Sequence, residues 1–292
     1  EELFQMALDD GLVYVTGFTD STDFWTTTDA YSDTLRNRDA FVSVLDTSKS
    51  GADSLVYSTL FGGSGYDEGY GIAVSDGVIY FAGTTTSNDL PLKNPVQAGY
   101  GGGPGYGDAF AAKLDPTKSG ANQLLFSTYL GGSDDELPGG VAADDAGYMH
   151  IVGTTGSTDF PTTTVSLPYS GGDADAFLVK MGTVTPTCIV YSIFVGSSGD
   201  DDGLRGIALD DQGNAYVVGA VGGDGLPTVN PLQDTFKGGS AVEDITGLGL
   251  YGPADALIAK FDTTGTMTFG TYLGGYNDDS AIGVDLAAGN VY

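Results

Sequence analysis

The chain has 292 residues, with 39 acidic against 10 basic side chains and a formal net charge of −29. That charge repels phosphate backbones, which argues against nucleic-acid binding, and the single cysteine excludes an intrachain disulfide. No run of 18 apolar residues occurs, so no membrane-spanning helix is expected. Gly, Asp, Thr and Tyr are abundant, which favours strands and turns over helices.

Three short motifs recur four times along the chain in a fixed order. The first is a Tyr-Val-Thr-Gly-like segment at 14–17, 80–83, 150–153 and 216–219, which begins again at 291–292. The second is Asp-Ala-Phe or Asp-Ala-Leu, which starts at Asp39, Asp108, Asp175 and Asp255. The third resembles Leu-Gly-Gly and lies at 60–63, 129–132, 194–197 and 272–275. The motifs divide the chain into repeat units of approximately 7–72, 73–141, 142–207 and 208–283, with a partial fifth at 284–292.

Each unit reads as four short strands, named a to d. In the second unit we expect strand a at 71–75, b at 78–84, c at 108–114 and d at 124–130. Asp76-Gly77 predicts a tight hairpin between a and b, because both positions tolerate positive φ. Four-stranded antiparallel sheets that repeat in tandem are typical of the blades of a β-propeller, so the predicted fold is all-β.

The motifs resemble the SBBP family of bacterial β-propeller repeats. The similarity lies in 57–63 (YSTLFGG), 108–115 (DAFAAKLD) and 157–162 (STDFPT), and comparable motifs extend over nearly the whole chain. The resemblance implies the propeller fold and an exported, surface-associated setting, and it implies no reaction. The chain departs from the pattern at Trp25, which stands where the other units have proline, and at Val44, which stands where they have lysine.

Four units and part of a fifth predict a segment of a larger ring, of about seven blades. A strand edge left open at each end is an aggregation hazard. We therefore expect further segments of the same chain, or another protein subunit, to cover both ends.

The d–a crossovers carry clusters of carboxylates at the same end of each blade as the long b–c loops. Calcium takes six to eight oxygen ligands, which adjacent acidic side chains and glycine carbonyls can supply. Calcium is therefore a candidate cofactor, and the alternative is that these residues cap turns and solvate a surface. The candidate ligands are Asp67, Glu68, Asp134, Asp135, Glu136, Asp200, Asp201, Asp202, Asp278 and Asp279.

Other polar residues recur with the blades and favour a structural role. Each Asp that opens a strand c is expected to bond backbone N–H groups between blades. Three strand-c lysines either pair with crossover carboxylates or lie along the blade with their heads in solvent. These lysines are Lys113, Lys180 and Lys260.

Three residue types that occur once in the chain are read as structural. His150 is expected to pack within a strand, Cys188 to be a small buried residue, and Trp25 to join the blade core. A catalytic serine on a nucleophile elbow is excluded because no Gly-x-Ser-x-Gly motif occurs. Aromatic residues in b–c loops can stack on sugar rings, so glycans are possible partners. These residues are Tyr100, Tyr106, Tyr169 and Tyr251.

The sequence favours a non-enzymatic extracellular propeller that serves as a scaffold, adhesion or structural module of a bacterial cell-surface layer or filament. The alternative is a secreted polysaccharide-acting enzyme, a hydrolase or a lyase, that uses loop carboxylates. Repetition argues against catalysis, because a catalytic pair should be unique to one blade. The most distinctive segment is 237–253, which contains Glu243 and Asp244.

Overall fold

The computed structural model describes residues 1–163, 169–184, 188–199, 203–238, 254–287 and 289–292. These residues form two compact units, which are described separately. The first unit comprises Glu1–Met149 and Gly182–Cys188, and the second comprises His150–Met181 and Ile189–Tyr292. Among the described residues, no helix has both the length and the apolar character needed to span a bilayer.

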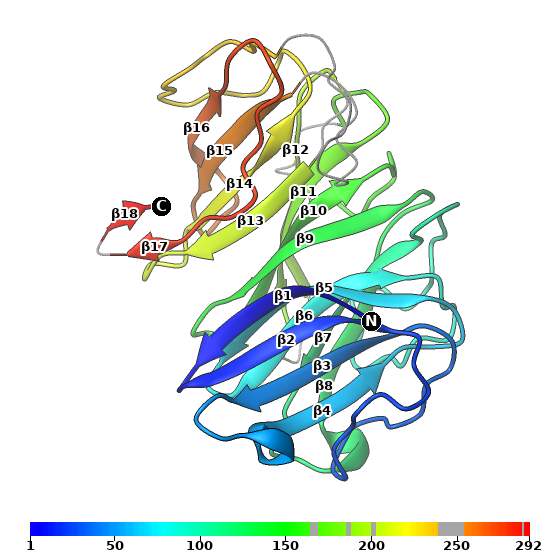
Figure 1. Cartoon of the computed structure of the whole chain (residues 1–292). Helices are drawn as coiled ribbons and strands as arrows, with labels where there is room; N and C mark the ends of the chain where they lie inside the picture. Colours follow the sequence, from blue (N-terminus) through cyan, green and yellow to red (C-terminus); the bar gives the residue numbers. More distant parts are fainter. Residues whose placement is uncertain (164–168, 185–187, 200–202, 239–253, 288) are drawn as a thin grey trace. The chain divides into compact units, whose positions relative to one another are not determined.

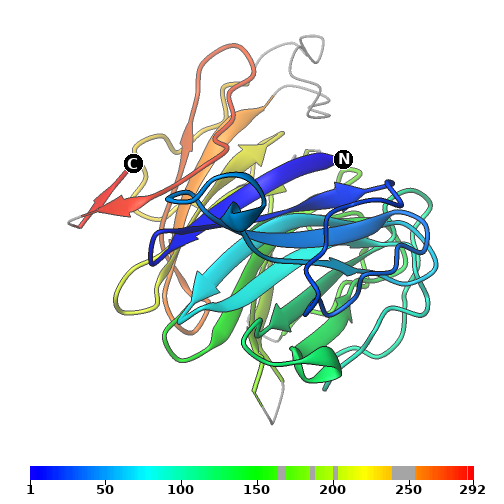
Figure 2. The same cartoon turned by 60° about the horizontal axis from the view of Figure 1, so that its bottom comes forward.

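The structure is all-β, with four-stranded antiparallel sheets whose strands follow chain order (Figures 1 and 2). Two short 3-10 turns, Gly51–Ser54 and Gly120–Asn122, lie in the c–d connections of the first two sheets. The strands of these two sheets are β1 (Glu2–Asp9), β2 (Leu12–Thr19), β3 (Asp39–Asp46), β4 (Leu55–Phe61), β5 (Asp67–Ser75), β6 (Val78–Thr85), β7 (Asp108–Leu114) and β8 (Leu124–Leu130).

The later strands repeat the same plan, and a two-stranded hairpin ends the chain. They are β9 (Glu136–Ala143), β10 (Tyr148–Thr155), β11 (Asp175–Gly182), β12 (Cys188–Val195), β13 (Gly203–Leu209), β14 (Ala215–Val221), β15 (Asp255–Phe261), β16 (Met267–Leu273), β17 (Leu286–Ala287) and β18 (Asn290–Val291). The sheets agree with predicted propeller blades. In the second sheet, β7 and β8 match the prediction, whereas β5 begins four residues earlier, at Asp67.

The a–b hairpins are closed by two kinds of turn. Asp10-Gly11 and Asp76-Gly77 both have positive φ, of 46° and 79° and of 52° and 70°, as a two-residue type I′ turn requires. The next hairpin is longer, and Asp144 Oδ1 accepts the N–H groups of Ala146 and Tyr148. A side-chain oxygen therefore organises the turn where the Asp-Gly pair is missing.

The b–c loops protect the outer edge of strand d in their own sheets. Lys93 and Ser127 exchange two backbone hydrogen bonds, of 3.2 and 2.9 Å, and Val229 and Gly270 exchange two of 3.0 and 2.9 Å. Thr27 N–H donates to the Ser58 carbonyl at 3.0 Å in the first sheet. These bonds cover strand edges that would otherwise be free to pair with another chain.

The core of the first unit lies between the first and second sheets. Phe61 at the end of β4 packs edge-on against Phe81, with ring centroids 5.2 Å apart, and also contacts Phe110. The buried Tyr57 hydroxyl donates to Gln123 Oε1 at 2.7 Å, which satisfies its polar end. In the second unit, residues of β11 and β12 pack in the same way against Val217, Leu257 and Phe261.

Two predictions of burial are wrong. Cys188 is exposed, because the first residues of β12 extend beyond the part of the strand that other elements cover. Trp25 is 69% exposed, because the neighbouring Phe24 takes the place in the core, 4.8 Å from the Phe41 ring. The prediction for His150 is confirmed, since its side chain is fully buried in β10.

Candidate functional site

A pair of buried carboxylates lies where the first sheet passes to the second. Asp39 opens β3, Asp67 opens β5, and both side chains are buried. They meet at Gly62, where an added Cβ would lie 2.6 Å from Asp39 Oδ1 and 2.6 Å from Asp67 Oδ2. Glycine is required here because both carboxylates approach its backbone more closely than any side chain allows.

The same pair recurs in later repeats. Asp108 and Glu136 crowd against Gly131, and Asp255 and Asp279 crowd against Gly274. In each pair the crossover carboxylate binds the backbone of the next residue. The N–H groups of Gly63, Gly132 and Gly275 donate to Asp67, Glu136 and Asp279 at 2.8, 3.2 and 2.7 Å. The Leu-Gly-Gly motif therefore encodes a carboxylate-bound turn.

The carboxylates that open strand c bind the loop of their own repeat. Asp39 Oδ2 accepts the Arg36 N–H at 3.2 Å, and Asp255 Oδ2 accepts the Lys237 N–H at 2.9 Å. The two oxygens of Asp108 accept the N–H groups of Gly101 and Gly102. The predicted bonds to backbone are thus present, but these partners belong to the same unit's b–c loop and not to a neighbouring blade.

Burial makes the two carboxyl groups of the first pair weaker acids than usual. It raises the pKa of Asp39 to about 6, and the Asp67 charge adds to the effect, while the Arg36 N–H and charge oppose it. Burial also raises the pKa of Asp67. Among the described residues, the buried oxygens without a hydrogen-bond partner include Oδ1 of Asp39, of Asp67 and of Asp255. Two close, buried carboxylates of this kind can share a proton or hold a cation between them.

The pairs differ in the side chain that stands beside them. Arg36 Nη1 donates to the Gly62 carbonyl at 3.2 Å and brings a positive charge to the first pair. At the fourth, Gln233 Nε2 donates to Asp255 Oδ2 at 2.7 Å, and its Oε1 accepts the Gly274 N–H at 3.0 Å. The fourth pair therefore has a neutral neighbour.

The remaining calcium candidates are engaged separately. Asp135 Oδ1 accepts three consecutive N–H groups, those of Gly105, Tyr106 and Gly107, at 2.8 to 2.9 Å. Asp134 Oδ1 accepts the Asp135 N–H, and Asp278 Oδ1 accepts the Ala254 N–H. Asp200, Asp201 and Asp202 lie outside the described residues. Within the described ranges, no three Asp, Glu, His or Cys side chains gather closely enough to hold a metal ion.

Glu68 belongs to a charged cluster that the sequence did not predict. Arg38 Nη1 donates to Glu68 Oε1 at 2.7 Å, its Nε donates to Asp20 Oδ1 at 2.9 Å, and its guanidinium lies 4.2 Å from the Phe18 ring centre. The Tyr70 hydroxyl donates to Glu68 Oε2 at 2.9 Å, and burial raises the pKa of Tyr70. An arginine before Asp-Ala-Phe in one unit alone was the signal available in the sequence.

Two of the strand-c lysines, Lys113 and Lys260, contact groups other than the crossover carboxylates. Lys260 Nζ donates to Asp210 at 3.1 Å and to the Tyr216 hydroxyl at 2.6 Å, so it pairs with the a–b turn at the opposite end of the strands. Lys113 Nζ lies 4.5 Å from the Tyr80 ring centre, and burial lowers its pKa. Lys113 is buried and its Nζ donates to the Thr183 hydroxyl at 3.4 Å, so its charged end does not reach solvent as predicted.

The loop tyrosines have different degrees of access. Tyr100 packs on Tyr129 with ring centroids 5.9 Å apart, and Tyr169 packs edge-on against Phe194. Tyr106 is exposed and remains accessible for stacking on a sugar ring. Tyr251, Glu243 and Asp244 lie outside the described residues.

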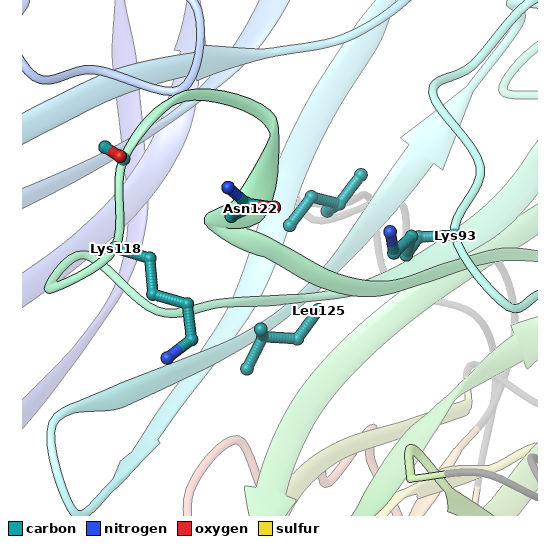
Figure 3. Close-up of a pocket in the computed structure, with 6 residues that line it drawn as sticks. Lys93, Lys118, Asn122 and Leu125 are labelled. Carbon is teal, nitrogen blue, oxygen red and sulfur yellow. The ribbon is translucent and has the colours of Figure 1, made fainter.

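A pocket of about 500 Å³ lies beside β8 in the first unit (Figure 3). Lys93 of the b–c loop and Lys118 of the c–d connection contribute to its lining, together with Leu124 and Leu125. Lys118 Nζ is held 3.0 Å from Asp115 Oδ2, so part of the positive charge is neutralised. The described residues that line the pocket include no pair of carboxylates, so glycoside hydrolysis by such a pair is not supported there.

Comparison with known families agrees with the repeat pattern. Residues 125–161 match the family model of the SBBP β-propeller repeat. The match runs from β8 through the crossover with Glu136 to β10 and the Asp-Phe-Pro segment, so the resemblance is confirmed for this part of the chain. No curated protein matches the chain.

Proposed function

We propose that this chain, which carries an SBBP β-propeller repeat, is a non-enzymatic extracellular module that acts as a scaffold, adhesion or structural part of a bacterial cell-surface layer or filament. The observation that carries the proposal is the repeated carboxylate pair. Its members bind backbone N–H groups at equivalent positions of different repeats, as residues that maintain a fold do. The charge of −29 favours solubility of such a module.

Two measurements test the proposal: the location of the chain in producing cells, and its ability to cleave polysaccharides. Intact producing cells are treated with a protease that cannot cross membranes, and the chain is followed with an antibody. Loss of the full-length chain from intact cells is expected, whereas protection until the cells are lysed would contradict an extracellular role. The purified protein is also incubated with a panel of bacterial and plant polysaccharides, and release of reducing ends or unsaturated sugars would favour the enzyme.

We also propose that calcium stabilises the module and that the Asp255–Asp279 pair is the preferred site. Both carboxylates lie against the backbone of Gly274. Asp255 Oδ1 is buried without a hydrogen-bond partner among the described residues, and the neighbouring Gln233 side chain is uncharged, so it does not repel a cation. These oxygens suit a hard cation, and glycine carbonyls and water would complete its shell. At the Asp39–Asp67 pair, Arg36 opposes cation binding by charge repulsion.

The partners that we propose are other protein subunits or further segments of the same polypeptide, together with glycans. Exposed apolar side chains on the first and last sheets support protein partners, since exposed apolar groups on one face indicate contact surfaces. The exposed Tyr106 supports glycan stacking. Loss of binding to isolated cell-wall glycan on changing Tyr106→Ala would support the latter, and unchanged binding would contradict it.

A further inference from the structure

Aromatic and charged side chains gather where the first sheet passes to the second, with β5 beside β1 and β2 (Figure 1). The guanidinium of Arg38 faces two aromatic rings, 4.2 Å from the centre of Phe18 and 5.4 Å from that of Tyr66. Its Nε and Nη2 donate to the two carboxylate oxygens of Asp20 at 2.9 and 3.1 Å, and its Nη1 donates to Glu68 at 2.7 Å. We call these five residues the Arg38 cluster.

The polar groups of the cluster are held in place by several contacts. The paired bonds between Arg38 and Asp20 fix the guanidinium plane, as bidentate ion pairs do. The Tyr70 hydroxyl donates to Glu68 Oε2 at 2.9 Å, and the Phe4 ring stacks on Tyr70 with centroids 4.4 Å apart. Groups that are ordered before binding lose less entropy when a ligand arrives, so this arrangement favours a binding site.

Tyr66 replaces a residue that maintains the fold at other junctions. The equivalent positions in the later repeats hold Asp135, Asp200 and Asp278. The Asp135 carboxylate accepts three loop N–H groups, and the Asp278 carboxylate accepts the Ala254 N–H. Tyr66 has no carboxylate to make such a bond, and its side chain is 53% exposed. The first junction has therefore exchanged a structural contact for an accessible aromatic ring, which indicates a binding role.

A second exposed tyrosine lies near the same charged groups. Tyr106, in the loop before β7, is 51% exposed. Burial raises the pKa of Tyr70, and Glu68 and then Tyr106 add to the effect, so Tyr106 lies close to Tyr70. Its backbone is fixed, because its N–H donates to Asp135 Oδ1 at 2.8 Å. Two accessible aromatic rings thus lie near one set of ordered polar groups.

This combination of side chains suits a neutral sugar. The apolar face of a pyranose ring stacks on tyrosine, which offers a large contact area with few rotatable bonds. Sugar hydroxyls can donate to the carboxylates of Asp20 and Glu68, whose oxygens each accept more than one hydrogen bond, and can accept from further N–H groups of Arg38. An anionic ligand is disfavoured, because one guanidinium already faces two carboxylates and the chain carries a net charge of −29.

We propose that the Arg38 cluster, together with Tyr106, binds a neutral pyranose oligosaccharide, with Tyr66 as its main stacking surface. The inference rests on the proposed function, which includes glycans among the partners, and it specifies the site and the class of sugar.

Isothermal titration calorimetry of the whole chain tests the proposal with defined sugars. The neutral probes are maltohexaose, cellohexaose, laminarihexaose and mannohexaose, and the anionic comparison is hexagalacturonate. At least one neutral probe is expected to bind, and hexagalacturonate to bind more weakly than that probe. Tyr66→Ala and Tyr66→Asp should each raise the Kd about tenfold or more, whereas Tyr66→Phe should keep it within about threefold, because the ring is retained.

Two controls separate binding from folding. Tyr276→Ala removes a tyrosine that is 88% exposed and lies outside the cluster, so the Kd should not change. Tyr66→Asp supplies the residue type that the other junctions carry, so it should unfold in urea at the same concentration as the wild-type chain or a higher one.

Several results would overturn the proposal. They are the failure of all four neutral probes to bind at up to about 10 mM, an unchanged Kd in Tyr66→Ala, an equal loss in Tyr276→Ala, or tighter binding of hexagalacturonate. A chain that is exposed on the cell surface but binds none of the probes would refute this site alone. A chain that binds a neutral probe through Tyr66 but lies inside the cell would refute the extracellular role instead.

Discussion

The first and fourth carboxylate pairs share one backbone arrangement but have different neighbours. Asp39 and Asp67 meet on Gly62 beside Arg36, whereas Asp255 and Asp279 meet on Gly274 beside Gln233. The repeat fixes where the carboxylates lie, and the loop decides which charge stands next to them. Repetition in a sequence therefore identifies a structural feature, while differences between its copies show where the charge beside the carboxylates changes.

The largest expected effect comes from filling the shared glycine. Gly62→Ala or Gly274→Ala places a Cβ against two buried carboxylates, and overpacking of this kind costs about 1–3 kcal/mol. Urea unfolding should show a comparable loss at both positions, since the backbone arrangement is the same. Gly99→Ala is the matched control, because its Cβ would meet nothing within 4 Å. Equal stability of the Gly62 variant and the control would contradict the close approach.

The effect of calcium removal on the Tm should distinguish the first carboxylate pair from the fourth. A ligand present at a hundred times its dissociation constant stabilises the folded state by about 2.7 kcal/mol. We expect a chelator to lower the Tm of the wild-type chain and of Asp39→Asn, and to leave Asp255→Asn nearly unchanged. If the chelator still lowers the Tm of Asp255→Asn, calcium binds at another site. If the chelator leaves the Tm of the wild-type chain unchanged, calcium does not stabilise the protein.

The pH dependence of stability should come from the first pair. The folded pKa of Asp39 is about 6, above its ordinary value of 3.8, so the folded state holds this proton more tightly than the unfolded state. This contribution is fully present below pH 3.8 and is lost as the pH rises through about 6. Asp39→Asn should flatten the fall of stability over that range, as followed by urea unfolding at several pH values. An unchanged profile would show that Asp39 titrates normally.

The smallest effect is expected from a substitution that gives the first pair an uncharged neighbour, as the fourth pair has. Arg36→Gln removes the positive charge beside Asp39, so at neutral pH without calcium the stability should fall, by about 1 kcal/mol or less. Added calcium should restore part of that loss, as a second increment in Tm beyond the wild-type response. Lys49→Gln, which removes an exposed pair with Asp46, should show no such calcium response and serves as the control.

The sequence predicted strands well because each motif marks one. Asp108 and Leu130 were placed at strand ends, and the Asp76-Gly77 hairpin has the expected φ values. The candidate site was predicted only in part. The sequence places carboxylates such as Asp67 and Glu68 side by side, which predicts a shared ligand set, but alternate residues of a strand point to opposite sides. Asp67 therefore turns inward to Asp39, and Glu68 bonds to Arg38.

The sequence motifs do not predict contacts between residues that are distant in the sequence. Nothing local to Asp39 indicates that Asp67 will share Gly62 with it, because the contact depends on how the crossover folds. The errors at Cys188 and Trp25 have a similar origin. A motif places a residue in a strand or loop, but the neighbouring elements decide whether its side chain is covered.

The central claim is that the repeated carboxylate pairs maintain the fold and do not perform a reaction. The most direct test measures the free energy of unfolding and polysaccharide turnover of Asp67→Asn and Asp279→Asn in the same preparations. We predict a clear loss of stability in both variants, with no turnover in either variant or in the wild-type chain. Unchanged stability together with the loss of a wild-type polysaccharide-cleaving activity would contradict the claim.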